Sequence, residues 1–196
     1  MSSIFSDPFF RRGTTLLGGE DIELSSGGAP IAGGEVVGQV KAFQDVNPAS
    51  RGERYSNRLV YCVAARYLGS TVTDGSTVAG TAYTFDDASP LATFTNKATN
   101  ADVAAGKPVG VLDEYLTGQL RQNDIVWLVV KGPTSIRKGN SSSVAAGTGV
   151  ELGSSGTAGQ AVPISTGANI GNSIAGSAVT GSQGTLLRIN KTADFI

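Results

Sequence analysis

Glycine content constrains this chain more than any other feature. The sequence has 27 glycines among 196 residues, about twice the average share of roughly 7%. A glycine in a helix interior costs about 1 kcal/mol relative to alanine, because it gives up the most backbone freedom on folding. Long helices are therefore disfavoured, and short strands joined by tight turns are favoured. We predict a mainly β fold, with a compact β-barrel or β-sandwich body and less than about 15% helix.

The chain divides into an N-terminal arm and a body. Residues 1–34 are broken by three glycine-rich stretches, at 18–19, 25–28 and 33–34, with only short apolar pairs between them. Such a segment holds too little apolar surface to build a core of its own. We therefore predict an extended arm over residues 1–34 and a β-rich body over residues 35–196.

The arm nevertheless carries a cluster of large side chains. Phe5, Phe9 and Phe10 are three of the seven phenylalanines in the chain, and Arg11 and Arg12 follow directly. Aromatic residues and arginine are the types enriched at interface hot spots. Two interpretations stand: an arm that docks its phenylalanines into a neighbouring subunit, or a terminus whose aromatics have no role. We predict that these five residues form the main partner-binding site.

Several segments have the pattern of strands. Residues 36–43 alternate between apolar and polar, while residues 58–68 are nearly all apolar with many β-branched and aromatic side chains. Residues 78–85 form a third candidate. Residues 125–130, Ile-Val-Trp-Leu-Val-Val, are continuously apolar, as expected of a strand covered on both faces. A monomer with one sheet would leave one of those faces exposed, so we expect the protein to self-associate.

A weak internal repeat occurs in the second half of the chain. An apolar residue and a glycine at 109–110 precede the strand at 125–130, and Ile170-Gly171 similarly precedes a predicted strand at 185–190. A chance match is one explanation in a glycine-rich chain. If this repeat is structural, it predicts two similar hairpin-like units packed into one sheet system.

Residues that carry enzymatic chemistry are sparse. The chain has no histidine, which removes Ser-His-Asp, Cys-His and histidine–metal arrangements. The adjacent carboxylates Asp113-Glu114 and Asp86-Asp87 are best explained as turn-forming or solvated acids, and the single cysteine, Cys62, as a buried, inert thiol. We expect a protein that is not an enzyme and needs neither cofactor nor metal.

Charge and hydropathy exclude further classes. The net charge is −1 and no stretch concentrates lysine and arginine, so a nucleic-acid partner is not expected. The longest apolar run, residues 59–65, is far shorter than the roughly 20 residues of a membrane span. The first residues lack the pattern of a secretory signal, and a lone cysteine fits synthesis in a reducing cytoplasm.

The order of several weak motifs in the last ninety residues resembles the small capsid cement proteins of tailed phages. These motifs are an Ala-Ala-Gly stretch leading into Val-Gly-Val-Leu at 104–112, an Asn-Asp-apolar strand at 122–132, and alanine- and glycine-rich stretches within 144–162. The closing pair is Ile-Gly at 170–171 and Gly-Thr-Leu-Leu-Arg-Ile at 184–189. The long arm and the insert between Val40 and Ala104 depart from the family pattern.

This resemblance implies a head decoration protein with a β-barrel-like or β-sandwich body, often a homotrimer. It implies that the major capsid protein is the partner and that the outer capsid surface of the virion is the location, after synthesis in the host cytoplasm. The alternative is a phage fibre or receptor-binding module with a carbohydrate-facing surface. A hydrolase that uses two carboxylates is a third, weaker possibility.

Overall fold

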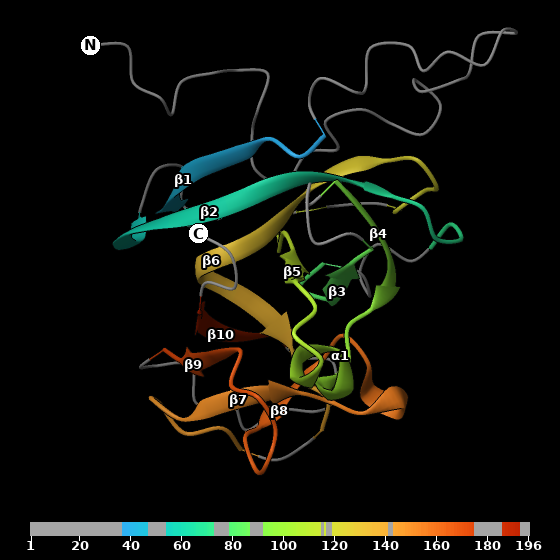
Figure 1. Cartoon of the computed structure of the whole chain (residues 1–196). Helices are drawn as coiled ribbons and strands as arrows, with labels where there is room; N and C mark the ends of the chain where they lie inside the picture. The colour runs from blue at the N-terminus through green and yellow to red at the C-terminus, as the bar shows by residue number, and fades with distance from the viewer. Residues whose placement is uncertain are drawn as a thin grey trace, which may run out of the picture.

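The computed structural model describes residues 37–46, 54–72, 79–86, 92–114, 116, 119–140, 143–174 and 186–192. Ten strands dominate this part of the chain (Figure 1), beside one short α-helix and one 3-10 turn at Ser155–Thr157. The strands are β1 (Val40–Val46), β2 (Arg54–Tyr67), β3 (Ala82–Phe85), β4 (Thr93–Lys97), β5 (Val109–Leu112), β6 (Ile125–Arg137), β7 (Gly149–Leu152), β8 (Ala161–Pro163), β9 (Gly171–Ser173) and β10 (Leu186–Lys191); the helix is α1 (Asn100–Ala104). The predicted mainly β fold is confirmed.

Five strands close into a small barrel. β2 pairs in parallel with β4, which is followed around the ring by β3, β5 and β6 in antiparallel pairs. β6 also pairs antiparallel with β2, and this last pairing closes the ring. The residues between Val40 and Ala104, which depart from the cement-protein pattern, therefore supply three of the five barrel strands. Closure leaves these strands without a free edge where they pair.

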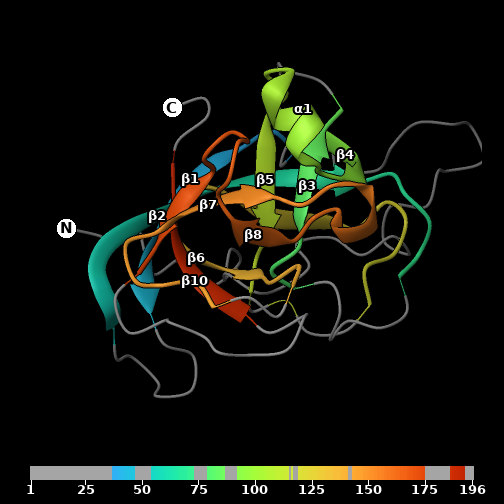
Figure 2. The ribbon, with the colours of Figure 1, turned by 90° about the horizontal axis from the view of Figure 1, so that it is seen from below.

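Four of the remaining strands, β7 to β10, extend the sheet below the barrel. Along the sheet, β6 is followed by β10, β9, β7 and β8, and β1 lies at the opposite end beside β2. Figure 1 shows β7 to β10 below the barrel strands, and Figure 2, viewed from below, shows β7 and β8 in front of β3 and β5. β6 belongs to both parts, since it pairs first with β2 and β5 and then with β10.

At Gly132, strand β6 changes its pairing partner from β2 to β10. The pairing of β2 with β6 shifts register between Tyr61 and Cys62, and Gly132 has a positive φ of 97°. A Cβ atom there would approach the backbone carbonyl oxygen of Leu59 more closely than real Cβ atoms do. Glycine is needed both for the left-handed backbone and for the close approach of β6 to β2.

The two faces of β6 contribute to two different cores. Val126, Leu128 and Val130 belong to the barrel interior, where Tyr83 and Phe94 pack with ring centroids 5.0 Å apart. The alternate residues Ile125, Trp127 and Val129 belong to a second core between the barrel and the lower strands. A strand buried on both faces reads as continuously apolar, so this prediction is confirmed.

β6 is covered on both faces within a single chain. We expected the apolar stretch at 125–130 to require a neighbouring subunit, but every residue in it is at most 1% exposed within the single chain. The second core, in which Phe43 of β1 contacts Trp127 edge to face at 5.1 Å, supplies the missing cover. That argument for self-association is wrong, and a trimer stays a prediction that rests on the family resemblance.

The two copies of the internal repeat correspond to two pairs of strands. β5 and β6 form one antiparallel pair, β9 and β10 form another, and the β6–β10 pairing joins the two in one sheet. Several boundaries differ from the predictions. The first strand begins at Val40 instead of residue 36, because Val37 and Gly38 form a turn in which Gly38 has a φ of 83°. The third begins at Ala82, after a turn at 79–80.

Candidate partner-binding surface

The predicted anchor residues of the arm, Phe5, Phe9, Phe10, Arg11 and Arg12, lie outside the described residues. Their role, like the division into arm and body, stays a prediction.

The described part of the chain holds no group of three or more metal-ligating side chains. It also contains no helix long and apolar enough to cross a membrane. Cys62 is fully buried in the second core, as predicted.

The carboxylate pair Asp113-Glu114 is only partly as we expected. The pair lies in a turn, in which the amide of Leu116 donates to the carbonyl oxygen of Asp113 at 3.1 Å. It is not solvated, however, because Asp113 is 2% exposed and the Glu114 side chain 7%. Asp86 is exposed and accepts a hydrogen bond from the Thr95 hydroxyl at 2.9 Å, while its neighbour at position 87 lies outside the described residues.

Arg188 explains why Glu114 is buried. Its Nη1 donates to Glu114 Oε1 at 2.8 Å, and its Nη2 pairs with Asp45 Oδ1. Burial alone acts to lower the pKa of the guanidinium, but the hydrogen bonds and charges of the two carboxylates outweigh it and raise the pKa overall. Asp45 lies on β1, Glu114 follows β5 and Arg188 lies on β10, so this cluster ties three elements together. The cluster holds one positive and two negative charges, and both carboxylates share the same guanidinium.

Two hollows on the surface are mainly polar. One lies beside Tyr67 and Tyr83, where Asn96 and Gln122 contribute amide groups. The other contains Glu151, whose carboxylate accepts hydrogen bonds from Ser165 Oγ at 3.2 Å and from the Gly167 amide at 2.5 Å.

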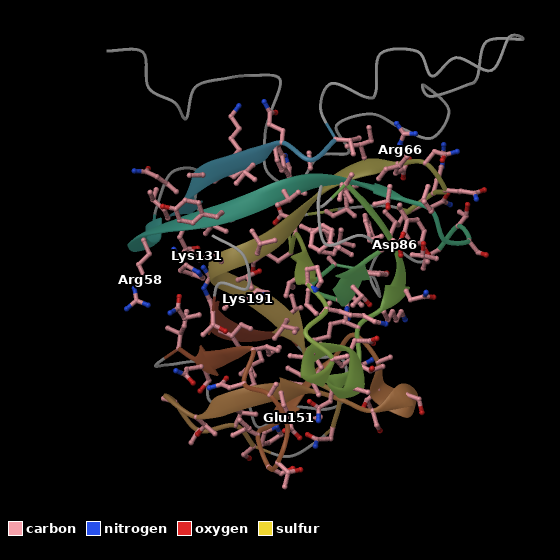
Figure 3. All side chains as sticks on the ribbon, viewed as in Figure 1. Arg58, Arg66, Asp86, Lys131, Glu151 and Lys191 are labelled. Carbon is pink, nitrogen blue, oxygen red and sulfur yellow. The ribbon has the colours of Figure 1, made fainter. Side chains whose placement is uncertain are left out.

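A third hollow is cationic, and we call it the β2–β6–β10 groove after the strands that line it. Arg58, Lys131 and Lys191 contribute its charges, and Leu59, Tyr61 and Pro133 contribute apolar surface. Figure 3 shows Arg58, Lys131 and Lys191 on the same side of the molecule. The Lys131 ammonium lies 5.2 Å from the centroid of the Tyr61 ring, within the range of a cation–π contact. No acidic residue of the described chain lines this groove.

Sequence reasoning missed this groove. No stretch of the sequence concentrates lysine and arginine, and the three cations are separated by about sixty or more positions. The places of two cations relative to the strands were the sequence feature that could have indicated the groove. Lys131 directly follows the apolar stretch of β6, and Lys191 ends β10. Pairing of β6 with both β2 and β10 brings these positions together.

Comparison with known proteins leaves the family open. No protein-family model and no curated protein sequence matches the chain. A solved structure that aligns with it is described as the crystal structure of head fiber gp8.5 N base in bacteriophage phi29. The alignment has 14% identity and a TM-score of 0.41, and it covers 68% of this chain and 94% of that one. At these values the alignment assigns no function to this protein.

Proposed function

We propose that this protein is a structural component of a phage head: a decoration protein that binds the outer surface of the major capsid protein and stabilises the shell. One observation carries the proposal. The motifs that resemble cement proteins fall on β5, β6, β7, β8, β9 and β10 or on their entry turns, and these six strands are consecutive in the sheet. The resemblance therefore follows one continuous structural unit, not scattered loops.

Such a protein would bind one shell through many copies at once. A shell offers many identical sites, so modest affinity at each site adds up to strong net stabilisation. A protein that binds the assembled lattice in preference to a loosened one stabilises it by mass action. In this proposal the arm supplies the main anchor, through Phe5, Phe9 and Phe10, and the body acts as a trimer.

The rings of Trp127, Tyr67 and Tyr83 do not support the receptor-binding alternative. The single tryptophan, Trp127, is 1% exposed, and Tyr67 and Tyr83 are 5% and 1% exposed. Carbohydrate sites favour exposed aromatic faces beside polar groups, and burial removes these rings from that role. The two-carboxylate hydrolase is also less well supported, because Glu114 is bound to Arg188.

The test is deletion of residues 1–12, measured by binding to undecorated capsids and by release of capsid contents on heating. We expect the truncated protein to fold, as judged by circular dichroism, and to lose most capsid binding and heat protection. A second variant, in which Phe5, Phe9 and Phe10 are replaced by alanine, separates the aromatic contribution from that of Arg11 and Arg12. Sedimentation equilibrium of the full chain checks the trimer.

Two results would decide against parts of the proposal. If the truncated protein binds and protects capsids as well as the full chain, the arm is not the anchor. If the full chain shows no capsid binding at all, the decoration role itself fails.

A further inference from the structure

The polar hollow beside Tyr67 and Tyr83 lies at one end of the barrel, and we call it the Tyr83 hollow. β2 ends at Tyr67 and β4 ends at Lys97, and both residues line the hollow together with Gln122, which stands shortly before β6 begins. Its volume is about 490 Å³. Small-molecule sites have volumes of roughly 300–1,000 Å³ and are common at the mouths of β-barrels. The hollow therefore has the place and the size of a ligand site.

The phenol of Tyr83 is a buried polar group with an unused hydrogen-bonding capacity. Tyr83 is 1% exposed and lines the hollow, and its hydroxyl forms no hydrogen bond within the described part of the chain. The neighbouring Tyr67 hydroxyl, by contrast, donates to the carbonyl oxygen of Ser70 at 2.9 Å. Burial raises the pKa of Tyr83, so this phenol keeps its proton and remains a donor. Buried polar groups are normally paired, and a ligand in the hollow would pair this one.

Lys97 brings a positive charge to the same place. Tyr83 on β3 and Lys97 on β4 are directly opposite in an antiparallel ladder, so their side chains lie on one face of the sheet. Lys97 is exposed and forms no ion pair with any described carboxylate. The described residues that line the hollow include no acid, and the hydroxyl of Thr95 is directed to Asp86, outside the lining. The hollow therefore attracts an anion.

Amide groups complete the lining. The side-chain nitrogen of Gln122 donates to the carbonyl oxygen of Leu68 at 3.4 Å, which leaves Oε1 of Gln122 to accept a hydrogen bond. The exposed side chain of Asn96 adds both a donor and an acceptor. A carboxylate only accepts hydrogen bonds and matches a phenol beside an ammonium, whereas hydroxyl groups both donate and accept and match the amides.

We propose that the Tyr83 hollow binds a small polyhydroxy carboxylate, with its carboxylate on Lys97 and the Tyr83 hydroxyl and its hydroxyl groups on Asn96 and Gln122. A neutral polyol would gain nothing from the charge of Lys97, and an alkyl carboxylate would leave the amide groups of the hollow unpaired. The hollow is separate from the predicted anchor residues of the arm. Its ligand does not have to come from a capsid, so failure of this proposal and failure of the decoration role can be told apart.

The experiment titrates the full-length, ¹⁵N-labelled protein with sodium gluconate at constant ionic strength and follows the amide signals by NMR. Two controls are matched to the ligand. Sorbitol has the same carbon chain with a hydroxymethyl group in place of the carboxylate, and hexanoate keeps the carboxylate but has no hydroxyl group. Gluconate should shift the signals of Asn96, Lys97 and Gln122 in a saturable way, and it should bind at least about 5-fold more tightly than either control.

Variants locate the site. Tyr83→Phe keeps the ring and removes the hydroxyl, and it should weaken gluconate binding about 3- to 10-fold, the effect of one hydrogen bond to a charged acceptor. Lys97→Gln should weaken it about 2- to 5-fold and remove most of the preference for gluconate over sorbitol. Lys107→Gln is the matched control, because it removes an exposed positive charge outside the hollow, and it should change affinity less than about 2-fold. Lys97→Gln alters an exposed side chain and keeps the test valid if Tyr83→Phe disturbs the barrel.

The proposal is overturned if gluconate causes no saturable shift, or if sorbitol or hexanoate binds as tightly as gluconate. It is also overturned if Lys107→Gln weakens binding as much as Lys97→Gln. Unchanged affinity in a folded Tyr83→Phe variant would exclude the buried phenol from the site and would count equally against the proposal.

Discussion

Arg188 donates a hydrogen bond of 2.8 Å to Glu114, a residue 74 positions earlier in the chain. The same guanidinium pairs with Asp45, whose side chain is 1% exposed. One residue of β10 is thus connected to β1 and to the segment after β5, across the boundary between the barrel and the lower strands. Because the cluster is largely removed from water, its integrity should matter more for stability than that of a surface ion pair.

Replacing Arg188 with methionine should therefore destabilise the protein by about 3 kcal/mol, because two poorly exposed carboxylates lose their cation. Urea denaturation measures the change in the free energy of unfolding. Lys107→Met is the control: it breaks an ion pair with Asp102 in which the lysine side chain is 56% exposed, and it should cost less than about 1 kcal/mol. Equal losses in the two variants would contradict a structural role for the Arg188 cluster.

Gly132→Ala should destabilise the protein more than a comparable substitution elsewhere. Gly132 has both a positive φ and the Leu59 carbonyl against the position of a new Cβ atom. Gly106 is a matched control, since its φ of 74° is also positive but nothing lies within 4 Å of the added Cβ. Gly106→Ala should cost about 1 kcal/mol from backbone strain alone, and Gly132→Ala clearly more. Thermal unfolding of both variants tests the difference; equal shifts would mean that the β2–β6 contact can relax freely.

Alkaline pH should destabilise the barrel through its buried tyrosines. Burial raises the pKa of Tyr83, with a further contribution from Tyr67, and burial also raises the pKa of Tyr67. A group whose pKa is raised by folding contributes its full stability below its unfolded value of about 10, and that stability is lost as the pH rises above it.

Spectrophotometric titration of tyrosinate should show late ionisation that coincides with unfolding. Tyr83→Phe should remove one late step and reduce the fall in unfolding free energy above a pH of about 10. Titration of all five tyrosines near the ordinary value, in a protein that remains folded, would be inconsistent with the packed interior.

Acid should weaken the start of α1. The hydrogen bond from Lys107 is the largest cause that lowers the pKa of Asp102, followed by that from Thr99. A lowered pKa means that this contribution to stability is present above the unfolded value and is lost as the pH falls through the folded one. An NMR titration of the Asp102 carboxyl should give a pKa below the ordinary value of 3.8 for an aspartate. Lys107→Met and Thr99→Ala should each move it upward; no movement in either would refute the assigned cause.

Local pattern was enough to predict much of this protein. Glycine content and short apolar runs indicate a mainly β body, because backbone freedom and side-chain periodicity act within a few residues. The continuous apolar stretch of β6 correctly indicates burial on both faces. The internal repeat between 109–130 and 170–190 corresponds to two pairs of strands. β4 and the extension of β6 beyond Val130 were missed, because their polar and glycine-containing sequences lack a clear alternation.

Only the tertiary structure decided what covers those faces and which charges meet. The β2–β6 pairing closes the barrel, and the second core covers Trp127 within the same chain, which removed the need for a neighbour that the sequence suggested. Glu114 looked like a solvated acid until β10 placed Arg188 beside it. Arg58, Lys131 and Lys191 share a groove only because three strands distant in sequence are paired. Such contacts depend on long-range strand register and packing, which no local pattern of residues specifies.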